Sequence, residues 1–210
     1  MRNSLPTIVT SALLSVGLLF ESASAQVSIN SLPGGSYTQN FNSLANSGTN
    51  NWTDNSTLPG WYAAKTNAGT PSSFTNYIAG TGSSTAGALY SFGASGSSER
   101  ALGSLASGNA NIGDIAYGVR FANDTGADIS SITITYTGEQ WRNNGNANVQ
   151  TLAFSYRVSD TAITSPDPAN AGSWTPFTAL DFTTPTVGGT TGALDGNAST
   201  NRHVYSPASS

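Results

Sequence analysis

Apolar and polar residues alternate along several stretches of this chain, and no stretch after residue 26 keeps the 3.6-residue apolar spacing of an amphipathic helix. The clearest alternation runs through residues 129–137, where Ile132, Ile134 and Tyr136 are expected on one face of a strand and three threonines on the other. Residues 151–159 and 115–123 follow the same pattern. These three stretches are predicted to form the centre of a β-sheet.

Weaker strand patterns separate segments rich in Gly, Asn, Ser and Pro, and they cover residues 37–41, 76–79, 88–93, 100–106 and 177–182. Long loops are expected at residues 45–59, 80–87, 143–148 and 184–201. Because most predicted strands have one apolar face and one Thr- or Ser-rich face, two sheets packed face to face fit better than a barrel. The predicted fold is all-β, an antiparallel two-sheet sandwich with a jelly-roll-like topology.

The first 25 residues have the pattern of an export signal. Arg2 and Asn3 precede an apolar run at residues 5–20, and Ala23-Ser24-Ala25 supplies the small residues of a cleavage site. We therefore expect a signal peptide at residues 1–25 and a single β-sandwich domain at residues 26–210. The predicted location is extracellular or at the cell surface, with the periplasm as the alternative. No second apolar run of about 20 residues follows, so no integral membrane anchor is expected in this chain.

Composition narrows the function classes. Cysteine is absent, which removes disulfides, thiolate nucleophiles and cysteine-bound zinc. The net charge is −4, and one lysine and six arginines are scattered without a basic cluster, so nucleic acid is not an expected partner. Charged residues make up only 9% of the chain, so Asn, Thr, Ser and Gly must provide the polar surface. Such a surface suits hydroxyl-rich surroundings, and a polysaccharide or a surface or matrix protein is the expected partner.

Residues for catalysis are few. The single histidine, His203, lies in a polar segment close to the C-terminus, which disfavours a Ser-His-Asp arrangement. Beyond the leader the only glutamates are Glu99 and Glu139, and a glycoside hydrolase would need both in one cleft. Structural hydrogen bonding, for example to Arg142, is the favoured interpretation of both. The chain is therefore predicted to be non-enzymatic, with a carboxylate-based glycoside hydrolase as the less favoured alternative.

A structural calcium ion is the one cofactor that the sequence leaves open. Asp124 and Asp128 lie in the segment Asn123-Asp124-Thr125-Gly126-Ala127-Asp128, and calcium takes carboxylates from such loops. The same segment is a good turn between strands, and it lacks the dense acidic spacing of a calcium loop. Turn formation is the stronger interpretation.

Aromatic residues near polar loops carry the main binding hypothesis. Sugars stack on exposed rings, and neighbouring amides hydrogen-bond their hydroxyls without a charge. The expected ring contacts are Trp61, Tyr62 and Trp141, with Trp52 as a further candidate, and the expected amides are Gln140 and Asn143. The alternative is that the tryptophans close the ends of the sandwich, which is the commoner role for any one of them.

Three stretches together resemble a family of exported bacterial β-sandwich proteins of the PEP-CTERM sorting-domain type. They are YTQNFNSLA at residues 37–45 leading to LPGWY at 58–62, ERALGSL at 99–105, and YTGEQWR at 136–142 followed by LAFSY at 152–156. The resemblance covers roughly residues 37–201, and TGEQWR is its most specific part. It implies a surface or extracellular-matrix role and transfers no catalytic residue.

The chain departs from that family after residue 201, where relatives continue into further strands and a C-terminal sorting tail. Here the sequence ends at Ser210 without such a tail, so the expectation is either a C-terminally truncated domain, in which a missing strand would leave an open sheet edge, or a shorter soluble relative. Two functions follow. The first is an exported surface or matrix module that contacts polysaccharide. The alternative is a structural or accessory domain that binds another protein of a secreted assembly.

Overall fold

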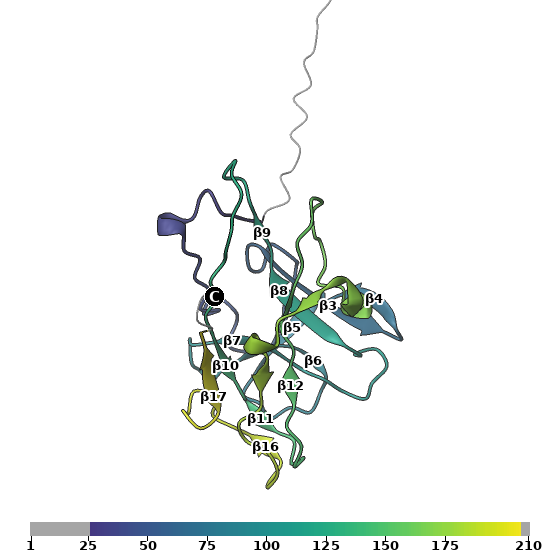
Figure 1. Ribbon diagram of the computed structural model, residues 1–210. Helices are drawn as coiled ribbons and strands as arrows, with labels where there is room; N and C mark the ends of the chain where they lie inside the picture. Colours follow the sequence, from purple (N-terminus) through teal and green to yellow (C-terminus); the bar gives the residue numbers. More distant parts are fainter. Residues whose placement is uncertain (1–25, 207–210) are drawn as a thin grey trace, which may run out of the picture.

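The computed structural model describes residues 26–206 and is all-β, as predicted (Figure 1). The predicted signal peptide lies outside the described residues. The first half of the chain contains every described strand of five or more residues, together with shorter ones: β1 (Val27–Ser28), β2 (Thr49–Asn51), β3 (Trp61–Asn67), β4 (Thr70–Ser73), β5 (Asn76–Gly80), β6 (Ala88–Phe92), β7 (Ala101–Leu105), β8 (Ile115–Val119) and β9 (Phe121–Ala122).

The second half forms only short strands: β10 (Tyr136–Glu139), β11 (Arg142–Asn143), β12 (Thr151–Leu152), β13 (Ser155–Tyr156), β14 (Thr175–Pro176), β15 (Phe182–Thr183), β16 (Gly192–Ala193) and β17 (Arg202–Tyr205). Three short 3₁₀ turns complete the described residues: η1 (Pro33–Gly35), η2 (Pro168–Ser173) and η3 (Thr178–Leu180).

Two sheets form the main sandwich. One contains four strands in the order β2-β5-β6-β7, and the other contains three in the order β4-β3-β8. Their facing side chains make a continuous core in which Ala63 of β3, Leu89 of β6 and Leu102 of β7 are buried, with Ile115 and Tyr117 of β8 packed against them. Leu44, Trp52, Leu58 and Phe74 close this core from the connecting segments. The predicted sandwich is therefore built mainly from the N-terminal half of the chain.

β6 is buried on both faces. Leu89 points into the main core, whereas Ala88, Tyr90 and Phe92 form a second cluster with Trp141 on the opposite face of the sheet. All five residues of β6 are buried, which explains its nearly continuous apolar sequence ALYSF. The segment around Trp141 thus covers the outer face of the four-stranded sheet, and β10, β11, β16 and β17 gather at the lower end of the molecule (Figure 1).

Two strand pairs are parallel, which departs from the predicted antiparallel arrangement. β1 pairs with β9 and β5 pairs with β6 in parallel, while the other pairs in the described part of the chain are antiparallel. In the first case the N-terminal segment is added at the end of β8 and β9. The first strand of the described chain therefore pairs with residues almost a hundred positions later in the sequence.

The strand predictions met different outcomes. Four predicted strands are present. The predictions at residues 76–79, 88–93 and 100–106 correspond to β5, β6 and β7, and residues 115–123 contain β8 and β9. The prediction for residues 129–137 was largely wrong, because β10 starts only at Tyr136. Residues 151–159 contain the two-residue strands β12 and β13, and residues 37–41 form no strand. Residues 177–182 contain η3 and only the first residue of β15. β3, the longest strand, was not predicted, because WYAAKTN lacks period-two alternation.

Candidate functional site

Trp141 lies between two layers and is only 4% exposed. Its ring is nearly parallel to that of Phe92, with centroids 6.3 Å apart. Two glycines press against it from loops: a Cβ on Gly82 would lie 1.7 Å from the Trp141 carbonyl oxygen, and one on Gly196 would lie 2.4 Å from the indole. The prediction that Trp141 is exposed for sugar stacking is therefore wrong, and its ring completes the second core instead.

The indole nitrogen of Trp141 is hydrogen-bonded to the carboxylate of Glu139. Nε1 donates a 2.9 Å hydrogen bond to Oε2 of Glu139, the last residue of β10. Burial raises the pKa of Glu139, and the negative charges of Glu99 and Asp195 raise it further. The Trp141 hydrogen bond and the positive charge of Arg202 act in the opposite direction.

Glu99 approaches the same region from the segment before β7. Its Oε2 accepts a 2.7 Å hydrogen bond from Asn197 Nδ2, next to the glycine that packs on Trp141. The two glutamates are thus close enough for the charge of Glu99 to act on Glu139, as the paired-carboxylate hypothesis requires. Each of them also accepts a hydrogen bond from the protein. Glu99 therefore ties the loop after β16 to the segment before β7, whereas the hydrogen bond of Glu139 to Trp141 is local.

The predicted amide ligands hold a loop. Gln140 Nε2 donates to the carbonyl oxygens of Arg142 and Thr186, at 3.0 and 2.8 Å, and its Oε1 accepts from the Thr186 amide at 2.8 Å. Asn143 Nδ2 donates to the Gly188 and Thr190 carbonyl oxygens. Both side chains are buried. Their polar atoms therefore fasten residues 186–190 and are not presented to a ligand.

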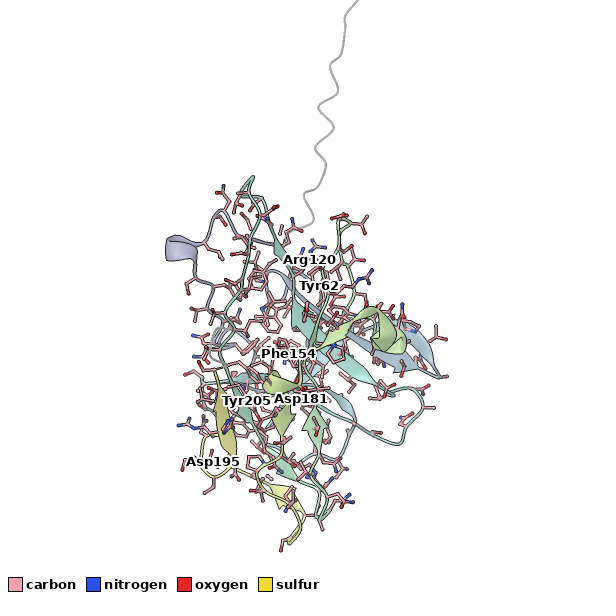
Figure 2. All side chains as sticks on the ribbon, viewed as in Figure 1. Tyr62, Arg120, Phe154, Asp181, Asp195 and Tyr205 are labelled. Atoms are coloured by element: carbon pink, nitrogen blue, oxygen red, sulfur yellow. The ribbon has the colours of Figure 1, made fainter. Side chains whose placement is uncertain are left out.

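The remaining predicted rings belong to the main sandwich. Trp52 is buried and donates from Nε1 to Asp54 Oδ1 at 2.7 Å. Trp61 is half-buried, with its Nε1 bonded to the Tyr37 hydroxyl at 2.8 Å. Tyr62 is buried, and Figure 2 shows it beside Arg120, whose guanidinium carbon lies 5.2 Å from the ring centroid. Exposure was thus wrongly predicted for Trp52 and Tyr62, and the packing interpretation of the tryptophans holds for Trp52 and Trp141.

The Asp124 carboxylate is hydrogen-bonded to β1 and to the residues that follow it. Its Oδ2 accepts from the Ser28 hydroxyl at 2.5 Å and its Oδ1 from the Asn30 amide at 2.8 Å. These hydrogen bonds lower the pKa of Asp124. Asp128 is exposed at the end of a hydrogen-bonded turn in which Asn123 Nδ2 donates to the Ala127 carbonyl oxygen. Among residues 26–206, no group of three or more His, Asp or Glu side chains is arranged to hold a metal ion.

Exposed apolar side chains form a feature that sequence analysis missed. They concentrate in the C-terminal half of the described chain: Ile129, Ile132, Val149, Leu152, Tyr156, Val158, Phe177, Val187 and Val204. Val158 is 87% exposed and Ile132 is 63% exposed. The alternating pattern had placed four of them, Ile132, Leu152, Tyr156 and Val158, on the apolar faces of predicted strands. Alternation indicates that a segment prefers an extended conformation, but it does not show which other segment will cover its apolar side chains.

Two surface hollows are also present. One of about 260 Å³ lies beside β17 and includes His203 and Tyr205, and the other of about 360 Å³ lies beside β1 and includes Val27, Leu32 and Tyr37. Neither includes a predicted ligand-binding residue or either glutamate of the carboxylate pair.

Comparison with protein-family models, with curated proteins and with solved structures finds no match. The resemblance to PEP-CTERM-type proteins therefore stays a prediction. In the part of the chain that the structure describes, no helix is long and apolar enough to cross a membrane.

Proposed function

We propose that this chain is an exported, non-enzymatic β-sandwich module that acts at the cell surface or in the extracellular matrix by binding a protein partner. The leader-like N-terminus and the charge-poor composition support export into such surroundings. The observation that carries the proposal is the group of exposed apolar side chains in the C-terminal half. Polysaccharide contact through Trp61, Tyr62 and Trp141 is not proposed, because these rings and their neighbouring amides are engaged within the protein.

The exposed side chains are large enough to matter energetically. Burying one Val or Ile side chain contributes about 1.5–3 kcal/mol relative to leaving it in water. Ile132 and Val158 retain more than half of their surface, so a partner that covers both would recover most of that free energy. Where such side chains lie together on one surface, they mark protein-binding sites on soluble domains.

The geometry favours addition of an extended strand. Among the described residues, 128–135 make no backbone–backbone hydrogen bond, although 129–135 continue directly into β10. Ile132 and Ile134 alternate with Thr133 and Thr135 along this segment, which is the pattern of a strand with one apolar face. Within the described residues the amide and carbonyl groups of this segment have no backbone partner, so they can accept an added strand, and the apolar side chains then select the partner.

The test is recovery of a complex from the culture medium of the organism that encodes the chain. We expect the full chain to retain a secreted protein, and Ile132→Lys to weaken retention at least about tenfold, because the isoleucine would no longer be buried. Val187→Lys is the matched control, since Val187 is also exposed and apolar but lies in the loop after β15. Equal retention by the Ile132→Lys and Val187→Lys variants would contradict the proposed surface.

A backbone variant tests strand addition itself. Thr133→Pro removes one amide donor from a segment that makes no backbone hydrogen bond within the described chain, so the fold is expected to be unaffected. An added strand needs that donor or the extended geometry around it, and the complex should be lost. A complex that survives Thr133→Pro would show that the partner binds side chains without pairing.

A second candidate function is carried by the carboxylate pair. Glu139 has a raised pKa and Glu99 lies close by, which is the combination of an acid and a second carboxylate in glycoside hydrolases. If this function holds, the chain releases reducing ends from a polysaccharide and Glu139→Gln abolishes that release. A chain that releases none from neutral or acidic polysaccharides excludes the hydrolase and leaves the carboxylate pair with its structural role.

A further inference from the structure

The hollow beside β17 has a wall of unusual chemistry for this charge-poor protein. It holds about 260 Å³, and its wall combines three aliphatic hydroxyl groups, a tyrosine, a histidine and an arginine: Thr183, Ser199, Thr200, Tyr205, His203 and Arg202. No acidic residue lines it. Arg202 and His203 are exposed, so their side chains are accessible to a ligand from solvent.

The floor of the hollow is held in place by aromatic packing. Tyr205 stacks on Tyr136 of β10 with ring centroids 5.0 Å apart, and His203 meets Tyr205 edge-on at 4.5 Å. The Tyr205 hydroxyl accepts a 3.3 Å hydrogen bond from the Thr183 amide. These contacts fix the Tyr205 ring before any ligand arrives, which lowers the entropic cost of binding.

A glycine makes room for this arrangement. Gly138 lies directly opposite His203 in the β10–β17 ladder, and a Cβ on Gly138 would lie 2.2 Å from the Phe182 ring. Because Gly138 has no side chain, Phe182 packs over β10 and brings β15, with Thr183, next to Tyr205. The hollow between β15 and β17 is a consequence of that close approach.

We propose that this hollow binds one unit of an acidic sugar, a saccharide that carries a carboxylate or a sulfate group. The volume is below that of sites for larger ligands, about 300–1,000 Å³, and is enough for a single ring. Ser199, Thr200 and Thr183 hydrogen-bond sugar hydroxyls, and His203 offers a ring edge and a nitrogen. Arg202 supplies the positive charge, and a guanidinium matches the planar geometry of a carboxylate or the oxygens of a sulfate.

Glu139 competes with the ligand for Arg202. The two residues are opposite each other in the β10–β17 ladder, and the charge of Arg202 opposes the rise in the Glu139 pKa that burial causes. The net charge of −4 also repels polyanions at long range. Binding is therefore expected to be modest, to weaken with added salt, and to become tighter in the Glu139→Gln variant.

The test uses the imidazole of His203, which gives a single set of NMR signals because the chain contains one histidine. The full chain is titrated with oligogalacturonate, with a sulfated dextran and with neutral dextran. We expect the His203 signals to shift with the two acidic probes and not with neutral dextran. The stronger of the two acidic probes then identifies carboxylate or sulfate as the preferred group.

Variants place the binding in the hollow. Arg202→Gln should weaken the affinity for the stronger acidic probe at least about tenfold, since a charge-assisted contact is lost. Val204→Thr is the control, because Val204 is exposed on β17 but does not line the hollow, so this variant should bind as the parent does. Unchanged affinity in Arg202→Gln, equal shifts with neutral dextran, or no shift with any probe would each overturn the proposal. Each of these results leaves the protein-binding surface around Ile132 unaffected.

Discussion

The Trp141 indole and the Glu139 carboxylate are joined by a 2.9 Å hydrogen bond, although only one residue separates them along the chain. Glu139 ends β10 and Trp141 precedes β11, so the chain turns its ring inward onto Phe92 while the indole nitrogen reaches back to the carboxylate. The segment TGEQWR, the most specific part of the family resemblance, is therefore a packing unit. Its tryptophan packs against the four-stranded sheet, its glutamine fastens the loop at Thr186, and its glutamate accepts from the tryptophan.

Trp141→Ala is expected to lower the free energy of unfolding by about 3–5 kcal/mol, because it removes a large buried ring and leaves a cavity against Phe92. Equilibrium urea unfolding measures the change. Trp141→Phe is the comparison, since it keeps most of the ring packing but removes the donor to Glu139, and it should cost less. A loss below about 1 kcal/mol in Trp141→Ala would mean that the second core does not form as described.

Removing the charge of Glu139 should stabilise the protein at neutral pH. Its pKa is raised above the ordinary value of 4.5, chiefly by burial, so the folded state favours the protonated form. The associated stability is present below the unfolded pKa and is lost as the pH rises through the folded pKa. Glu139→Gln keeps an oxygen that accepts from Trp141 but carries no charge. Its thermal midpoint should exceed that of the parent at pH 7, with the gap closing below about pH 4. A gap that does not depend on pH would contradict this assignment.

Asp124 should make the N-terminal strand sensitive to acid. Hydrogen bonds from Ser28 and Asn30 lower its pKa below the ordinary value of 3.8. The associated stabilisation is present above the unfolded pKa and is lost as the pH falls through the folded pKa. In Asp124→Ala, hydrogen exchange should quicken at the Val27 and Ile29 amides, which bond to carbonyl oxygens at the end of β8 and in β9. Asp128→Ala, in the same turn, is the control and should leave both amides protected.

Arg100 is expected to be structurally essential. It is 2% exposed, and its guanidinium donates to the hydroxyl and carbonyl oxygens of Ser91 in the centre of β6, and to the Gly80 carbonyl oxygen at 3.4 Å. Arg100→Ala leaves these buried acceptors without their donor and should cost about 3 kcal/mol or more of unfolding free energy. Arg157→Ala, at an exposed arginine, should change stability by less than about 0.5 kcal/mol. Similar losses in both variants, measured by urea unfolding, would contradict the role of Arg100.

Gly196 should tolerate no side chain. A Cβ there would lie 2.4 Å from the Trp141 ring, which is itself fixed between layers, so Gly196→Ala should destabilise by about 1–3 kcal/mol. Gly108→Ala is the matched control, because a Cβ at Gly108 meets no atom within 4 Å. Comparison of the two thermal midpoints distinguishes steric exclusion at Trp141 from a general cost of replacing loop glycines.

Prediction from the sequence succeeded where the apolar pattern coincided with a strand of the two larger sheets. β6, β7 and β8 were found because their apolar residues face the cores directly. The pattern at residues 129–137 was stronger, yet these residues remain mostly outside any sheet in the described chain. Alternation reports the preference of side chains for a pleated surface, whereas a strand also requires a second backbone at hydrogen-bonding distance. That second requirement depends on other segments and is not visible locally.

The candidate site shows the same division. That Glu99 and Glu139 are the only glutamates after residue 25 is a property of the sequence, and so are the neutral polar composition, the lack of cysteine and the all-β class. Their proximity was decided by the tertiary structure, because the loop carrying Asn197 joins the start of β7 to the end of β10. The burial of Trp52, Tyr62 and Trp141 was decided there as well. An aromatic residue beside a polar loop is compatible with stacking on a sugar or on another layer, and only the position of the second sheet face determines which contact forms.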